Sequence, residues 1–193
     1  MKKVLLISLF LAAFLERTVF DLGPNYELVT TAMILAVHYT GKKEGFLLTL
    51  AIVAFTDRII GNTSIFLFTW SGFLISALFA SDVLKKFNKR KNKLQNPITS
   101  GSFDPATLTI TAFSANILFF LWTNFGVWFL DSWGMYPDNV YGLLLSYINA
   151  LPFLKNQLVS TLVFVPSGFL VIEGAQKMLS RLKYRFLMTP AEA

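Results

Sequence analysis

The sequence predicts an all-α integral membrane protein with six transmembrane helices and both termini in the cytoplasm. Of its 193 residues, 54% are hydrophobic and only 15% are charged, unlike the mixture found in a soluble domain. Less apolar segments flank and separate the apolar runs. Of the seventeen Lys and Arg residues, all except Arg17, Arg58 and Lys155 lie in alternate segments, so basic segments alternate with segments that contain few basic residues. Because basic residues near a span resist translocation, this alternation predicts the orientation of a multi-pass protein in the cell (inner) membrane.

Six apolar runs are candidate spans, and together they form a single transmembrane domain over residues 1–193. A span needs roughly 20 residues to cross about 30 Å of hydrocarbon, and several of these runs are shorter. We place the spans at residues 3–20, 27–41, 45–61, 64–84, 105–130 and 154–179.

The first two spans have distinctive features. Lys2 and Lys3 precede an apolar run, as in a secretory signal, but no small-x-small cleavage pattern follows, so we expect a retained first helix. The second span contains Thr30, Thr31 and His38, which make it polar for a helix that faces lipid. We therefore expect this span to lie inside the bundle, where neighbouring helices can hydrogen-bond these side chains.

Glycine and proline mark the connections between the spans. Gly23, Gly41 and Gly61 follow the first, second and third spans. The longest hydrophilic stretch, residues 85–104, is predicted to be a cytoplasmic loop. It ends one residue before Pro105, and proline is favoured at the first position of a helix, so the fifth span is expected to begin there.

A short extra helix is expected on the outer side between the fifth and sixth spans. The segment from Val140 to Leu151 is apolar but too short to cross the membrane, and Pro152 is expected to break it. Pro166 predicts a kink within the sixth span, because proline lacks the backbone donor that a helix needs.

Polar side chains gather at the predicted outer boundary of the membrane. Charges at that depth are costly unless they are paired or face a wet cavity, so the cluster predicts a binding site. Carboxamides and hydroxyls beside aromatic side chains on the fifth span are the usual mixture in a small-molecule pocket. The candidate substrate-binding residues are Glu27, Thr31, Asp57, Arg58, Trp122, Asn124 and Asn149.

Two plainer interpretations compete with this pocket. Glu16 with Arg17, and Asp57 with Arg58, are also explained as residues at span ends whose charged groups reach water. The polar stripe that begins at Asn116 on the fifth span is also explained by hydrogen bonds between helices. The pocket is favoured because polar residues of the second span, the fifth span and the outer loops converge on one side of the membrane.

Several function classes are disfavoured by the sequence, and we expect neither an enzyme nor a cofactor. There is no glycine loop with lysine for phosphate, no His-Glu-x-x-His and no Gly-x-Ser-x-Gly pattern. With one histidine and no cysteine, we expect no metal site. The net charge of +6 comes from predicted cytoplasmic loops, so we expect contacts with membrane lipids rather than nucleic acid, through Lys85, Lys86, Lys89, Arg90 and Lys91.

The second half of the chain resembles a known family. The run from Phe119 to Trp128, then Tyr136-Pro137 and the run from Ala150 to Phe153, look like an uncharacterised family of small bacterial six-helix membrane proteins. The similarity covers most of residues 24–170 and is strongest over residues 116–157.

A more distant resemblance concerns function. Six helices with both ends inside, a capping first outer loop and the run from Leu151 to Asn156 are similar to substrate-binding S components of energy-coupling-factor vitamin transporters. That resemblance implies an outward-facing pocket for a vitamin-like or metal ligand, with a coupling membrane subunit and two ATPases as partners. S components commonly carry Ala-x-x-x-Ala on the first helix to dock the coupling subunit, whereas this chain has only Ser8-x-x-x-Ala12.

We therefore expect a substrate-capture membrane subunit, S-component-like, that binds a small solute from the outer side for uptake with partner subunits. The alternative is a non-transporting structural or scaffold membrane protein of the same fold. In that alternative the outer polar residues serve only to pack the helices together.

Overall fold

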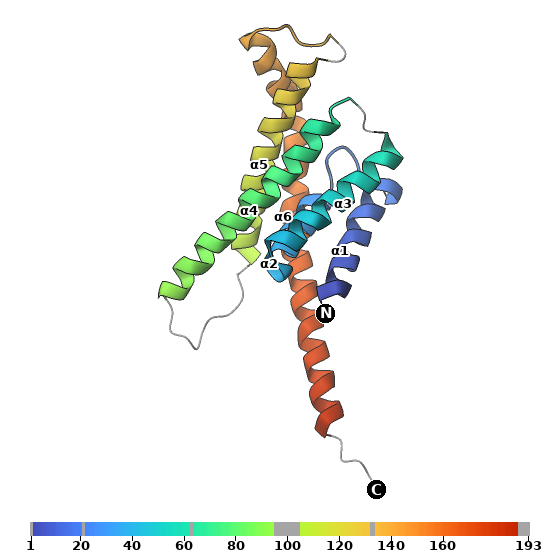
Figure 1. Ribbon diagram of the computed structural model, residues 1–193, viewed down its shortest axis with the longest axis vertical. Helices are drawn as coiled ribbons and strands as arrows, with labels where there is room; N and C mark the ends of the chain where they lie inside the picture. The colour runs from blue at the N-terminus through green and yellow to red at the C-terminus, as the bar shows by residue number, and fades with distance from the viewer. Residues whose placement is uncertain (1, 21, 62–63, 95–104, 132–133, 189–193) are drawn as a thin grey trace.

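The computed structural model describes residues 2–20, 22–61, 64–94, 105–131 and 134–188, which form six α-helices and one π-helical segment (Figure 1). No strand occurs within these ranges. The elements are α1 (Lys2–Leu15), the π-helical segment η1 (Glu16–Phe20), α2 (Val29–Thr40), α3 (Lys42–Ile60), α4 (Phe66–Leu94), α5 (Pro105–Leu130) and α6 (Val140–Met188).

Helix α2 is the centre of the bundle and contacts each of the other five α-helices. All of its residues from Val29 to Val37 are buried. They contribute to two hydrophobic clusters, one around Leu35 shared with α4, α5 and α6, and one around Ala32 shared with α1, α3 and α4. The prediction that this polar, threonine-containing segment lies inside the bundle is confirmed.

Within the described part of the chain, three helical segments are long and apolar enough to cross a membrane, namely Phe66–Phe87, Pro105–Leu130 and Val140–Leu182. Large apolar side chains are exposed on α6, including Val140 at 73% and Val171 at 71%. Exposed apolar surface of this kind is typical of helices that face lipid. Helix α2, by contrast, has 12 residues, and a helix rises only about 1.5 Å per residue, so it is shorter than a hydrocarbon layer of about 30 Å.

Helix α6 differs from the prediction. The expected short helix over 140–151 and the expected span over 154–179 are parts of one continuous helix, Val140–Met188, with Pro152 and Pro166 inside it. Pro152 therefore does not end the helix. A proline removes a single backbone donor, and the apolar turns on both sides of Pro152 still pack along α5. Among the described residues, α5 and α6 form the most extensive helix pair.

Helix α4 also extends beyond its predicted end. The fourth span was expected to stop at residue 84 and to be followed by a loop, whereas α4 continues to Leu94. Its last ten residues, 85–94, are rich in Lys and Arg, which are good helix formers. A basic helix end therefore takes the place of the first half of the expected loop, and residues 95–104 lie outside the described part of the chain.

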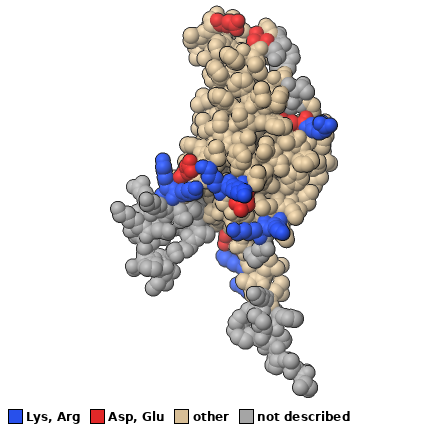
Figure 2. Space-filling view, viewed as in Figure 1, with Lys and Arg blue, Asp and Glu red and all other residues tan. Residues whose placement is uncertain are grey.

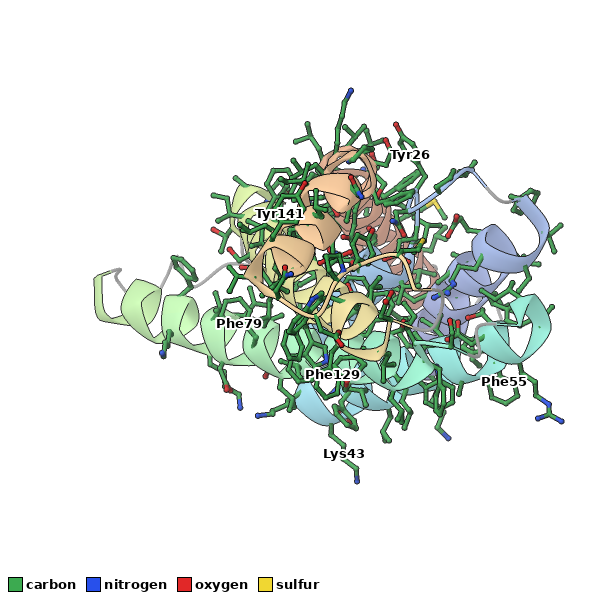
Figure 3. All side chains as sticks on the ribbon, turned by 90° about the horizontal axis from the view of Figure 1, so that it is seen from above. Tyr26, Lys43, Phe55, Phe79, Phe129 and Tyr141 are labelled. Carbon is green, nitrogen blue, oxygen red and sulfur yellow. The ribbon has the colours of Figure 1, made fainter. Side chains whose placement is uncertain are left out.

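Charge is distributed unevenly between the two ends of the molecule. The start of α1, the end of α4 and the second half of α6 lie towards the lower end in Figure 1, and the α3–α4 and α5–α6 connections lie higher. Most Lys and Arg side chains on the visible face gather over the middle and lower parts, with some acidic side chains among them, and further acidic side chains occupy the upper tip (Figure 2). Lys43, in the first turn of α3, points away from the bundle (Figure 3).

Candidate functional site

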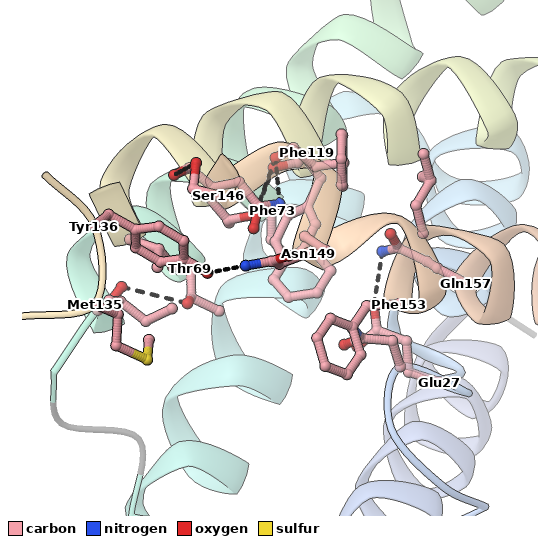
Figure 4. Close-up of a pocket in the computed structure, with 18 of the residues that line it drawn as sticks. Glu27, Thr69, Phe73, Phe119, Met135, Tyr136, Ser146, Asn149, Phe153 and Gln157 are labelled. Carbon is pink, nitrogen blue, oxygen red and sulfur yellow. Dashed lines mark hydrogen bonds between the residues drawn. The ribbon is translucent and has the colours of Figure 1, made fainter. Parts of the chain in front are cut away.

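A cavity of about 400 Å³ lies among η1, the connection before α2, and helices α4, α5 and α6 (Figure 4). Both polar and apolar side chains line it, which is typical of a small-molecule pocket. The lining residues are Arg17, Asn25, Glu27, Ile65, Thr69, Phe73, Phe119, Phe120, Thr123, Asn124, Val127, Met135, Tyr136, Ser146, Asn149, Ala150, Phe153, Leu154 and Gln157.

Arg17 is held in the cavity wall by a buried ion pair. It lies in η1, and π-helical turns are rare and frequently found at functional sites. Its Nη2 donates to Oδ1 of Asp57 at 2.9 Å, and Nε1 of Trp70 donates to the other carboxylate oxygen at 2.8 Å. The Asp57 side chain is only 3% exposed. The second guanidinium nitrogen, Nη1, is buried and has no hydrogen-bond partner among the described residues.

Glu27 projects from the connection formed by residues 22–28, ahead of α2 and outside the helices. Nε2 of Gln157 on α6 donates to Glu27 Oε1 at 3.1 Å (Figure 4). Glu16 fixes this connection, because its carboxylate accepts from the backbone N–H of Leu28 at 3.0 Å. The connection therefore aims a carboxylate at the side of α6.

The acidity of Glu27 is set mainly by the partial burial of its carboxyl group. Burial raises its pKa to about 7, while the nearby Arg17 guanidinium opposes the shift. The negative charges of Glu16 and Asp57 add to the increase, and the hydrogen bond from Gln157 counters it. At neutral pH this carboxyl is therefore poised between its charged and neutral forms.

Helices α5 and α6 supply the amide side of the cavity. Nδ2 of Asn124 donates to the carbonyl of Phe120 in the preceding turn at 2.8 Å. Nδ2 of Asn149 lies 3.5 Å from the hydroxyl of Tyr136, in the α5–α6 connection. Ser146 joins the two helices by donating to the carbonyl of Asn124 at 3.2 Å.

Aromatic rings form part of the cavity wall. The rings of Phe73 on α4 and Phe119 on α5 are 4.2 Å apart between centroids, and Phe120 lies 5.8 Å from the ring of Tyr147. Phe153 lines the cavity from α6. The cavity thus offers flat apolar surfaces beside a small number of polar groups.

Three of the residues predicted from the sequence, Glu27, Asn124 and Asn149, line this one cavity. Asp57 does not line it but lies behind Arg17, which it holds in place. The burial of Arg17 and Asp57 also contradicts the interpretation that they are span-end residues reaching water. Arg58, which is exposed at the end of α3, fits that interpretation.

Thr31, Arg58 and Trp122 do not line the cavity. Thr31 was expected beside Glu27 at helical spacing, but α2 begins at Val29, so the spacing does not apply to Glu27. Thr31 is instead buried inside the bundle.

Trp122 is separated from the cavity by the geometry of α5. It is two residues from both Phe120 and Asn124, which places it on the opposite side of the helix. There its Nε1 donates to the hydroxyl of Ser71 at 2.8 Å, and its ring lies 5.3 Å from Phe68.

The cavity also contains residues that were not among the predicted binding residues, chiefly Arg17 and Gln157. A signal for Arg17 was present, because an acidic residue inside a predicted span requires a basic partner. Gln157 is likewise a polar residue within an apolar span. Its contact with Glu27 joins residues 130 positions apart and has no local signature in the sequence.

The basic residues predicted to contact lipids lie partly outside the described side chains. Lys85 and Lys86 are exposed at the end of α4, whereas the side chains of Lys89, Arg90 and Lys91 lie outside the described ones. Among the described residues, no group of three or more His, Cys, Asp or Glu side chains is arranged to hold a metal ion.

No curated protein and no solved structure matches the chain. A family model, that of a family of unknown function (DUF6580), matches residues 1–183, nearly the entire chain. The chain therefore belongs to the DUF6580 family of unknown function.

Proposed function

We propose that this protein is a substrate-capture membrane subunit that binds a small solute in the cavity from the outer side, for uptake with partner subunits. One observation carries the proposal: a cavity of about 400 Å³ brings Arg17, Glu27, Asn124, Asn149 and Gln157 together against aromatic walls. Buried polar groups are costly unless they are paired, so a concentration of them around a hollow favours ligand binding over packing.

The proposal includes a topology of six membrane crossings with both termini in the cytoplasm of the cell. Exposed apolar side chains on α4, α5 and α6 support a lipid environment for these helices. The basic side chains gathered over the middle and lower parts of the molecule support a cytoplasmic position for the lower end (Figure 2). The cavity is lined by both the connection before α2 and the α5–α6 connection, and it would then open on the outer side.

Energy for uptake would come from partners, a coupling membrane subunit and ATPases, in the manner of S components. This part of the proposal rests on the resemblance in sequence and on the missing phosphate-binding loop. Ser8 and Ala12 on α1 are both exposed, and small exposed residues allow another helix to approach closely. The basic end of α4, including Lys85 and Lys86, is placed to meet lipid phosphates.

A second candidate, a scaffold of the same fold, is favoured by the shape of α6. Its last turns extend well beyond the rest of the bundle (Figure 1), which is a suitable geometry for contacting another protein. Pull-down distinguishes the two functions. Recovery of ATPase and coupling subunits would support capture, and recovery of envelope-assembly proteins would support scaffolding.

Thermal unfolding of the purified protein against a library of vitamins, related small solutes and metal ions tests the capture function. A ligand present at 100 times its Kd stabilises the folded state by about 2.7 kcal/mol, which is readily detected. Asn124→Ala should abolish the stabilisation, and Arg58→Ala, at an exposed position away from the cavity, should retain it. If no solute raises the melting temperature, the capture function is contradicted.

A further inference from the structure

The carboxyl groups around the cavity outnumber the basic groups. Among the described residues, Arg17 is the basic residue that lines the cavity and Glu27 is the acidic one, and the charges of Glu16 and Asp57 act on Glu27 from behind this lining. Arg17 is already paired with Asp57 at 2.9 Å, so most of its charge is balanced within the protein. The net charge around the cavity is therefore negative whenever Glu27 is ionised.

The surface above the cavity has the same sign. Acidic side chains occupy the upper tip of the molecule, and basic side chains on that face lie mostly over the middle and lower parts (Figure 2). Asp131 and Asp138 belong to the α5–α6 connection, which also supplies Met135 and Tyr136 to the cavity lining. A field of this sign attracts small cations and repels small anions as they approach.

The aromatic walls suit the same class of ligand. Phe119, Phe120, Tyr136 and Phe153 line the cavity together with Glu27. Ring faces carry negative electrostatic potential and attract organic cations, most strongly where water is excluded. A carboxylate facing aromatic rings is therefore a better match for an organic ammonium group than for a carboxylate ligand.

We propose that the cavity binds a small organic cation, such as an amine, a quaternary ammonium or a heteroaromatic ammonium ion, with its charged nitrogen beside the Glu27 carboxylate and its apolar part against the aromatic walls. This inference rests on the proposed capture function and names its substrate class. Gln157 holds the carboxylate in place from α6 through the 3.1 Å hydrogen bond.

Binding of such a cation depends on the protonation of Glu27. The groups that face this carboxyl are Glu16 and Arg17 of η1, Asp57 of α3 and Gln157 of α6. The cation stabilises the charged form of Glu27, so binding releases a proton at pH values below its pKa of about 7. Affinity for a permanent cation should fall as the pH drops below this pKa and level off about tenfold lower, because the protonated carboxyl, like the amide in Glu27→Gln, offers no negative charge.

Isothermal titration of the full-length protein in nanodiscs tests the inference with probes matched in shape. Choline and benzyltrimethylammonium are permanent cations, dimethylbutanol is the neutral carbon isostere of choline, and dimethylbutanoate is its anionic counterpart. We expect at least one of the cations to bind about tenfold or more tightly than the neutral isostere, and the anion to bind more weakly than either. The cation affinity should weaken between pH 8 and pH 6 while that of the neutral probe stays constant.

Two variants show whether the preference arises at Glu27. Glu27→Gln keeps an oxygen acceptor for Gln157 but removes the charge, so it should reduce cation affinity about tenfold and leave the neutral probe unaffected. Asp82→Asn removes an exposed acidic charge on α4 that does not line the cavity, and it should leave the affinity nearly unchanged.

The outcomes separate this inference from the function on which it rests. Tighter binding of the anion, or a cation affinity that Glu27→Gln does not change, would overturn the cation class. If the solute library yields a ligand while neither cation binds better than the neutral isostere, capture stands and the cation class falls. If neither the library nor the probes bind, the capture function itself falls.

Discussion

Two asparagines on α5, two helical turns apart, have contrasting surroundings. Asn116 lies in the middle of the bundle, where its Oδ1 accepts from Thr30 at 2.8 Å and its Nδ2 donates to the hydroxyl of Thr161 at 2.7 Å. Its hydrogen-bonding capacity is used to join α2, α5 and α6. Asn124 lines the cavity and donates to a carbonyl of its own helix.

The contrast separates two uses of polar side chains in a bundle of apolar helices. At Asn116 every strong contact is to another helix, so this residue holds the fold together. At Asn124 the side-chain hydrogen bond stays within its own helix and, among the described residues, none joins it to another helix, while the side chain lines the cavity. Polar residues within one stripe of a helix therefore fall into two groups. Structural residues have their side-chain hydrogen bonds supplied by neighbouring helices, and cavity-lining residues do not.

The largest loss of stability is expected from Arg17→Met. Removing the guanidinium leaves the Asp57 carboxylate buried without its basic partner, which typically costs about 3–5 kcal/mol. Reversible unfolding in detergent should show this loss, and the double variant with Asp57→Asn should recover much of it. Equal destabilisation by the single and double variants would show that the ion pair does not hold the cavity wall.

Asn116→Leu should cost less, about 2 kcal/mol, because it leaves the hydroxyls of Thr30 and Thr161 without their shared partner. The same unfolding measurement detects this loss. Ligand binding by the folded fraction should persist. Loss of binding with unchanged stability would reverse the roles assigned to the two asparagines.

The pH dependence of stability should identify Glu27. Its folded-state pKa of about 7 lies above the value of 4.5 for a free glutamate, so the folded state binds more protons than the unfolded state between these values. The stabilising contribution is complete below pH 4.5 and is lost as the pH rises through about 7. Because Glu27 is partly exposed, we expect a change of about 1 kcal/mol.

Unfolding experiments from pH 4.5 to pH 8 measure this change, and Glu27→Gln serves as the control because it cannot titrate. The variant should show a flatter profile than the unmodified protein over this range. Identical profiles would show that Glu27 does not titrate near neutrality in the folded protein.

Asn124→Ala should have the smallest effect on stability, below about 0.5 kcal/mol, because only a bond within its own helix is lost. Its effect on solute binding should nevertheless be complete. Thermal unfolding with and without solute measures both quantities on the same sample. A destabilisation comparable to that of Asn116→Leu would abolish the distinction between the two positions.

The sequence predicted the helices well where start signals and apolar length agreed. The fifth span, residues 105–130, has the same limits as α5, because Pro105 marks its start and an uninterrupted apolar run follows. The sixth was predicted poorly, because Pro152 is a strong local break signal. Packing along α5 outweighs that signal in α6, and such packing is not visible in a single segment.

The cavity was predicted only in part, for a related reason. Glu27, Asn124 and Asn149 were recognisable as polar residues at one predicted membrane boundary. Two side-chain pairs form or support the cavity wall, Arg17 with Asp57 and Glu27 with Gln157. Their members lie 40 and 130 positions apart in the sequence, so only the packing of the helices brings them together. The structure places Trp122 outside the lining of this cavity, because proximity in sequence does not fix which side of a helix a residue occupies.

Cysteine labelling tests most directly whether the cavity faces water outside the cell. The chain has no cysteine, so Asn149→Cys at the cavity and Lys86→Cys at the exposed end of α4 each give a single reactive thiol. In intact cells a membrane-impermeant maleimide should label Asn149→Cys, and it should label Lys86→Cys only after permeabilisation. Labelling of Lys86→Cys from outside, with Asn149→Cys protected, would contradict an outward-facing capture site.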